Sequence, residues 1–186
     1  DSGLRRTTSF QIVATAPSHS REKLINVSSR GLATADDPLI AGFVISPGGP
    51  KMLLIRAVGP TLTVFGLTGV LADPRLSVMS GSTTVGSNDN WLAVDADTMA
   101  AAGAFALTAG SKDAALVATL APGGYTAPVT ATDGGSGVAL LEVYDAASST
   151  AVNFVNASTR AYGGTGAASV PRLYFTARGL QGRELW

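Results

Sequence analysis

The chain has 186 residues, which suffices for one domain with a hydrophobic core and is short for two. Its 13 basic and 13 acidic residues cancel to a net charge of zero, which argues against a nucleic-acid partner and an electrostatic membrane anchor. The chain contains no cysteine, so it has no disulfide and no thiolate ligand or nucleophile.

The composition also bears on surface and location. Charged residues make up 14% of the chain, against about 25% in an ordinary globular protein, so we expect much of the surface to be covered. No apolar run approaches the roughly 18 residues of a membrane span. Asp1 as first residue is typical of a mature chain that has lost a signal peptide, although a trimmed chain would look the same. We expect a secreted protein, extracellular or at the cell surface.

The first half of the chain consists of short apolar or β-branched runs separated by turn residues, a pattern that predicts strands. The strongest hairpin signal is Pro47-Gly48-Gly49-Pro50, between two runs that are apolar at nearly every position. Such runs are typical of inner strands or of strands buried on both faces. The predicted strands span residues 9–15, 23–28, 39–46, 51–58, 75–79 and 83–86.

The second half contains one candidate helix, over residues 94–107, where Asp95 or Asp97 could cap an alanine-rich turn. Pro128 lies within a predicted strand and indicates an edge or a bulge there. The regular spacing of strands predicts an all-β, antiparallel, jelly-roll-like sandwich with at most one short helix around residues 94–106. The remaining predicted strands span residues 114–120, 125–132, 138–144, 151–158 and 170–177.

The chain repeats its own opening near its end. Residues 154–164 echo residues 24–34, with Asn156, Ser158 and Arg160 in the places of Asn26, Ser28 and Arg30. The offset is 156 − 26 = 130 residues, the length of a whole domain rather than of a solenoid turn. We therefore divide the chain into an N-terminal strand extension (1–22), a sandwich module (23–148) and a C-terminal extension that echoes the first strands of the module (149–186).

These motifs resemble a repeat module of large secreted and surface proteins of Verrucomicrobia-type bacteria. Such modules occur in tandem and open with N-[IV]-S-[ST]-R-G, which residues 26–31 match, although the second copy has Ala161 in place of Gly31. The segment DNW…LAPGGYT…GVALLEVYD is also similar to bacterial pre-peptidase C-terminal β-sandwich domains. The resemblance covers residues 24–145 and implies a non-catalytic extracellular module.

We find no catalytic constellation and no cofactor motif. The one histidine, His19, lies in a proline- and serine-rich loop, and no serine stands in a G-x-S-x-G elbow. Most carboxylates are next to glycine, proline or asparagine, where they cap turns. We predict no metal site, and whether calcium binds near Asp89 stays open because the complete calcium-loop pattern is missing. The sequence predicts that the protein is not an enzyme.

Two functions fit this pattern. The first is a structural protein, the protomer of a bacterial surface filament or layer, in which copies join head-to-tail by β-strand addition of a terminal segment. The alternative packing folds both end strands back into their own sandwich, and the echo then records descent from a tandem array. The residues predicted to form the assembly contacts are Phe10, Ile12, Val13, Asn156, Arg160, Leu173, Phe175 and Ala177.

The second function is an adhesive or carbohydrate-binding module of a larger secreted protein. Trp91 and Tyr125 are the candidate stacking platforms for a surface glycan, although aromatic residues make up only 6% of the chain. The expected partners are copies of the chain itself and a surface glycan, without nucleic acid.

Overall fold

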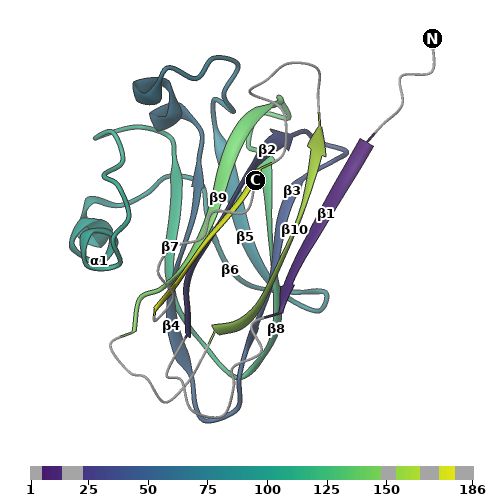
Figure 1. The fold of residues 1–186 in the computed structure, drawn as a ribbon. Helices are drawn as coiled ribbons and strands as arrows, with labels where there is room; N and C mark the ends of the chain where they lie inside the picture. The colour runs from purple at the N-terminus through teal and green to yellow at the C-terminus, as the bar shows by residue number, and fades with distance from the viewer. Residues whose placement is uncertain (1–5, 14–22, 148–153, 164–171, 179–186) are drawn as a thin grey trace.

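The computed structural model describes residues 6–13, 23–147, 154–163 and 172–178, and they form an all-β fold (Figure 1). The only α-helix among them is α1 (Ala96–Ala101), preceded by the 3-10 turns η1 (Pro60–Phe65) and η2 (Ala93–Asp95). The strands are β1 (Arg6–Val13), β2 (Lys23–Ala33), β3 (Leu39–Ile45), β4 (Lys51–Val58), β5 (Pro74–Ser80), β6 (Thr83–Asn88), β7 (Ala114–Leu120), β8 (Gly123–Ala131), β9 (Gly137–Asp145), β10 (Phe154–Gly163) and β11 (Arg172–Arg178).

Strands β2 to β9 form a jelly roll. One sheet has the order β7-β4-β9-β2 and the other the order β6-β5-β8-β3, with antiparallel pairing throughout both sheets. This is the strand order of two Greek keys wrapped face to face. The remaining strands extend the sheets: β10 pairs with β3, β1 pairs with β10, and β11 pairs with β2. The predicted antiparallel sandwich is confirmed.

The main hydrophobic core lies between the two sheets. Alternate residues of each strand point inward, since successive side chains of a strand face opposite ways. Strand β3 shows this alternation: Leu39, Phe43 and Ile45 are buried in the core, whereas Val44 is exposed on the outer face. The sheet that contains β3 therefore has one buried face and one open face.

The other sheet is buried on both faces at β4, which explains its almost unbroken apolar sequence. Leu53 and Ile55 point into the main core, whereas Leu54 and Val58 join a second cluster on the outer face. That cluster includes Met99 of α1, and Figure 1 shows α1 beside the β7–β4 side of the sandwich. The loops between the strands thus cover this face of the sheet.

Two local predictions differ from the structure. Asp95 occupies the N-cap position of α1, but its side chain makes no capping hydrogen bond. Pro128 lies on β8, which pairs with β3 on one side and β5 on the other, so the predicted edge position is wrong. The ladder between β8 and β5 nevertheless lacks its rungs at Ala127 and Pro128, where proline has no N–H to donate.

Candidate functional site: the edges completed by the terminal strands

Without the terminal strands, β2 and β3 would be the open edges of the jelly roll. Strand β10 pairs with β3 through six residue pairs, from Phe154↔Ile45 to Arg160↔Ile40. Strand β11 pairs with β2 through seven residue pairs, and β1 pairs with the far side of β10 through eight. An unpaired edge is a template for association, so these strands cover the two surfaces of the module that are most able to bind another chain.

All of the predicted assembly residues lie on these three strands. Phe10 is opposite Thr159 in the register, and Phe175 is opposite Val27. The rest follow the same pairing: Ile12↔Ala157, Val13↔Asn156, Asn156↔Val44, Arg160↔Ile40, Leu173↔Ser29 and Ala177↔Leu24. In this structure their strands pair within one chain.

Each terminal strand takes the place of an internal strand of the module. Strand β10 repeats β2 with the offset of 130 residues seen in the sequence. In the two registers Val27 pairs with Phe175 and its equivalent Ala157 pairs with Phe43, so β11 repeats β3 with an offset of 175 − 43 = 132. Likewise Val27 pairs with Val143 and Ala157 pairs with Ile12, so β1 repeats β9 with an offset of 143 − 12 = 131.

The chain therefore contains two equivalent three-strand units, β1-β2-β3 and β9-β10-β11, which interlock about an approximate two-fold axis. Strand β10 of the second unit lies between β3 and β1 of the first, as Figure 1 shows. Strand β2 of the first unit lies between β9 and β11 of the second. Each unit thus holds the middle strand of the other, and β4 to β8 connect the two.

The axis passes through the seam where β2 and β10 meet. The Thr159 hydroxyl donates a hydrogen bond of 2.7 Å to the Ser29 hydroxyl oxygen, and the two residues are 130 apart. The one backbone pair between β2 and β10 joins Leu32 to Tyr162, and these two residues are also equivalent positions of the repeat. A residue that contacts its own equivalent is the signature of an isologous, two-fold contact.

The tightest point of this seam is at Gly31. A Cβ atom at Gly31 would lie 2.5 Å from the Cβ of Ala161, which is too close for two carbon atoms. Ala161 is the equivalent of Gly31, and it departs from the glycine that closes the opening motif in the first copy. The close approach of β2 and β10 therefore requires glycine on one side of the axis.

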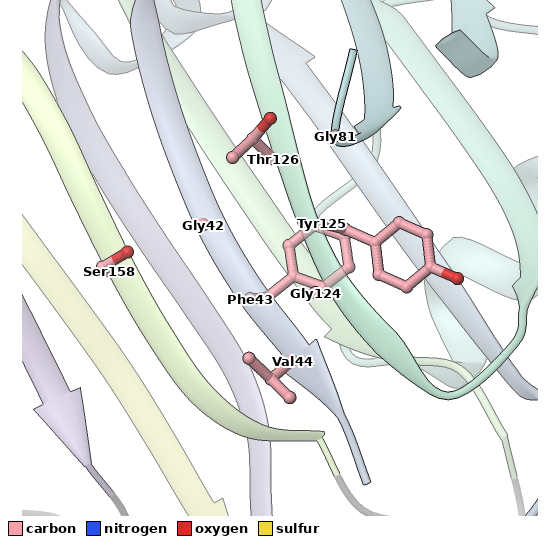
Figure 2. Close-up of a pocket in the computed structure, with 8 residues that line it drawn as sticks. All are labelled: Gly42, Phe43, Val44, Gly81, Gly124, Tyr125, Thr126 and Ser158. Atoms are coloured by element: carbon pink, nitrogen blue, oxygen red, sulfur yellow. The ribbon is translucent and has the colours of Figure 1, made fainter. Parts of the chain in front are cut away.

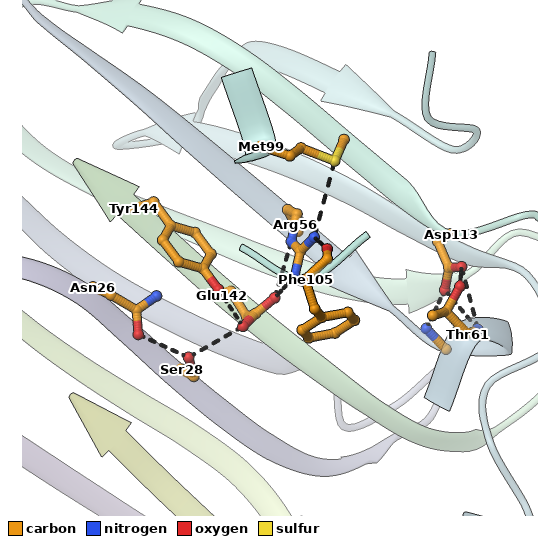
Figure 3. Close-up of polar contacts among 10 residues, drawn as sticks. Asn26, Ser28, Arg56, Thr61, Met99, Phe105, Asp113, Glu142 and Tyr144 are labelled. Carbon is orange, nitrogen blue, oxygen red and sulfur yellow. Dashed lines mark hydrogen bonds and ion pairs between the residues drawn. The ribbon is translucent and has the colours of Figure 1, made fainter. Parts of the chain in front are cut away.

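A buried polar cluster ties β2 to β9 and β4 (Figure 3). Arg56 is fully buried and forms a two-pronged ion pair with Glu142, with 2.9 Å between Arg56 Nε and Glu142 Oε2. The other carboxylate oxygen accepts hydrogen bonds from the Tyr144 hydroxyl at 2.7 Å and the Ser28 hydroxyl at 3.4 Å. Arg56 also donates to the Phe105 carbonyl at 2.6 Å, and its guanidinium lies 4.4 Å from the centre of the Phe105 ring.

Burial raises the pKa of Tyr144 far above its ordinary value of 10.0, and the negative charge of Glu142 raises it further. The folded protein therefore keeps the phenol proton at a pH where the unfolded chain loses it. The free energy of unfolding should fall above pH 10 with a slope of about 1.4 kcal/mol per pH unit from this group.

We expect Tyr144→Phe to lack this alkaline loss. Urea unfolding of both proteins between pH 8.5 and 11.5 measures it, because the titration of lysines and of the other tyrosines is common to both. The stability difference between the two should be constant below pH 10 and shift in favour of the variant above it. Parallel curves across the whole range would contradict the burial of the phenol.

A second buried carboxylate organises the loops at one end of the sandwich. Asp113 is fully buried and accepts hydrogen bonds from the backbone N–H of Gly59 at 2.7 Å and from the hydroxyls of Thr61 and Ser111, both at 2.5 Å. Ser111 in turn accepts the indole N–H of Trp91 at 3.2 Å. The half-buried Trp91 therefore serves to anchor this loop end.

A shallow hollow of about 340 Å³ lies on the open outer face of the β3 sheet (Figure 2). Gly42, Gly124 and Thr126 form its floor, and Ser158 of β10 forms one side. Tyr125 borders it, but the residue is only 8% exposed, and its ring stacks on Phe43 at a centroid distance of 5.6 Å. Little of Tyr125 is therefore exposed to a sugar, and its role as a stacking platform stays a prediction.

The described residues contain no group of three His, Cys, Asp or Glu side chains that could hold a metal. Near Asp89, the Asn88 side chain instead accepts the Ala115 N–H and donates to the Asn90 carbonyl, which is turn chemistry. His19 lies outside the described residues. None of the described helices is long and apolar enough to cross a membrane.

Sequence reasoning found the β2–β10 echo but missed the other two. The signal for β1 was present: Ser9-Phe10-Gln11-Ile12-Val13 follows the same pattern as Leu140-Leu141-Glu142-Val143-Tyr144. For β11 the shared signal is little more than Phe43 and Phe175. Only the register establishes these equivalences.

Comparisons of the chain with protein-family models, with curated proteins and with solved structures each give no match.

Proposed function

We propose that the chain is a non-catalytic structural protein whose copies join head-to-tail by exchanging β10 and β11. The observation that carries the proposal is that both strands complete module edges in the register of a repeated unit. The strands offer backbone hydrogen bonds for affinity and alternate side-chain positions for specificity. A neighbouring chain that supplied its own β10 and β11 would make the same contacts.

The buried charges of the described residues support a structural role rather than a chemical one. Arg56 and Glu142 pair with each other, Lys51 pairs with Asp145 at 2.8 Å, and Asp113 holds loop backbone. The side chains of all these groups are almost fully buried, where they fix strands and loops. We also propose that the protein is secreted and lies at the bacterial surface, which fits its low content of charged residues.

Cysteine trapping tests the exchange, because the chain has no cysteine of its own. One chain carries Ser29→Cys and a second, with a size tag, carries Thr159→Cys. Their hydroxyl oxygens lie 2.7 Å apart in the seam, within reach of a disulfide. We expect the two chains, refolded together at high concentration and then oxidised, to form a mixed 29–159 disulfide whose yield rises with protein concentration.

The double variant Ser29→Cys/Thr159→Cys on one chain is the control. It should close within the chain when dilute, because a strand on its own chain has a millimolar effective concentration. If the double variant closes while the mixture gives no 29–159 disulfide at any concentration, head-to-tail exchange is excluded. Electron microscopy of the wild-type protein should show fibres that the disulfide-closed double variant cannot form.

A further inference from the structure

We infer that the β2–β3 surface is self-complementary: two copies of the β2–β9 module can dock on each other about a two-fold axis, with β10 and β11 acting as a cap that occupies this surface. The partner is a second copy of the module. This inference goes beyond head-to-tail exchange and does not depend on it, because β10 and β11 take no part in the contact.

The argument starts from what β10 and β11 are. They repeat β2 and β3, and they bind β3 and β2 in matching registers. Because the ladder contacts are made by backbone groups, a surface that binds its own copy in this reciprocal way offers matching contacts to itself. In the resulting dimer β2 of each module pairs with β3 of the other, so each four-stranded sheet continues into a sheet of the partner.

The side chains at the axis allow this contact. Ser29 would meet the Ser29 of the second copy, which keeps the hydroxyl-to-hydroxyl hydrogen bond that Thr159 now makes. Gly31 would meet Gly31 and so remove the crowding, since the observed contact already tolerates a Cβ on one side. Ala161 facing Ala161 would place two Cβ atoms about 2.5 Å apart, so two caps cannot pair with each other. Sterics thus select module–module and module–cap contacts.

The cap explains why the surface is covered in a single chain. Tethered strands compete with a second molecule at a millimolar effective concentration, so the two-fold dimer appears only when the cap is displaced. A carboxylate introduced at the seam displaces it, because both Gly31 and Ala161 are buried at the contact. The strand that carries the substitution decides whether the docking surface stays intact. Ala161→Glu damages only the cap, whereas Gly31→Glu damages the module surface itself.

The experiment compares full chains that all carry Ser29→Cys as a reporter at the axis. With Ala161→Glu, we expect a covalent 29–29 dimer on oxidation, and a dimer mass in sedimentation of the reduced protein. With Gly31→Glu, we expect at least a tenfold lower dimer yield at the same concentration. Ser29→Cys alone should stay largely monomeric.

Thr159→Glu is a second variant that displaces the cap, because Thr159 is also buried. It shows whether the result depends on the particular substitution at Ala161. Monomers from both cap variants at high concentration overturn the inference, and so do equal dimer yields from the Ala161→Glu and Gly31→Glu chains. A 29–159 disulfide in the mixing experiment without any 29–29 disulfide here leaves head-to-tail exchange standing and removes two-fold docking. A 29–29 disulfide here without a 29–159 disulfide in the mixing experiment leaves two-fold docking standing and removes head-to-tail exchange.

Discussion

Replacing Glu142 by glutamine should lower the free energy of unfolding by about 3–5 kcal/mol, the usual cost of leaving a buried charge without its partner. Arg56 has none of its surface exposed, and Glu142 is the only carboxylate bonded to its guanidinium among the described residues. The neutral amide cannot compensate that charge. Urea unfolding monitored by circular dichroism measures the loss.

A double-mutant cycle separates the ion pair from the space that it fills. We expect Arg56→Met/Glu142→Leu to cost less than the sum of Arg56→Met and Glu142→Leu, because removing both charges together leaves neither one unpaired. The ion pair of the exposed Lys112 with Asp73 is the control, since Lys112→Ala should change stability little. Additive losses in the buried pair would show that the two charges do not interact.

Replacing Gly31 by alanine should lower the free energy of unfolding by about 1–3 kcal/mol, the range for forcing extra atoms into a packed site. The added Cβ would stand 2.5 Å from the Cβ of Ala161, and β2 and β10 would have to separate. The exchange Gly31→Ala/Ala161→Gly should recover most of the loss, because it moves the single methyl group across the axis. This rescue tests the direct contact between positions 31 and 161 across the seam.

Gly124→Ala is the control for the glycine substitution itself. A Cβ at Gly124 meets nothing within 4 Å, and its backbone is outside the left-handed region, so alanine should be tolerated there or slightly stabilising. A Gly31→Ala protein as stable as the wild type, or an exchange variant less stable than both single variants, would show that the seam is looser than the structure has it.

Much of the fold could be predicted from local sequence. The predicted strand at residues 51–58 coincides with β4, and its almost continuous apolar pattern indicated an inner strand or burial on both faces. The buried ion pair was missed, although its signal was visible: one arginine and one glutamate, each within an apolar strand. Charges in such places are almost never fully buried unless they are paired. Which charge meets which depends on β4 lying beside β9, and this pairing is set by the whole fold.

The two-fold arrangement could be predicted only in part. The echo of Asn26, Ser28 and Arg30 identified a copied strand, because polar residues at a tight seam leave a recognisable motif. Strands β1 and β11 are edge strands of their sheets, where apolar residues of similar size serve equally well, so their copies have diverged. Gln11 of β1 is the equivalent of Glu142 of β9, and the difference between them reflects their different neighbours. Strand β4, which supplies Arg56, has no copy, so a charge at position 11 would lack that partner.

The position of β1 also has a consequence for how the protein is made. Within the described structure β1 pairs only with β10, so after Val13 has been synthesised a further 163 − 13 = 150 residues must follow before the ladder can be complete. At a translation rate of about 5–20 residues per second, this wait lasts roughly 8–30 s. During that interval the ribosome-bound nascent chain carries β1 without its partner β10. Chaperones or neighbouring nascent chains can therefore bind β1 first.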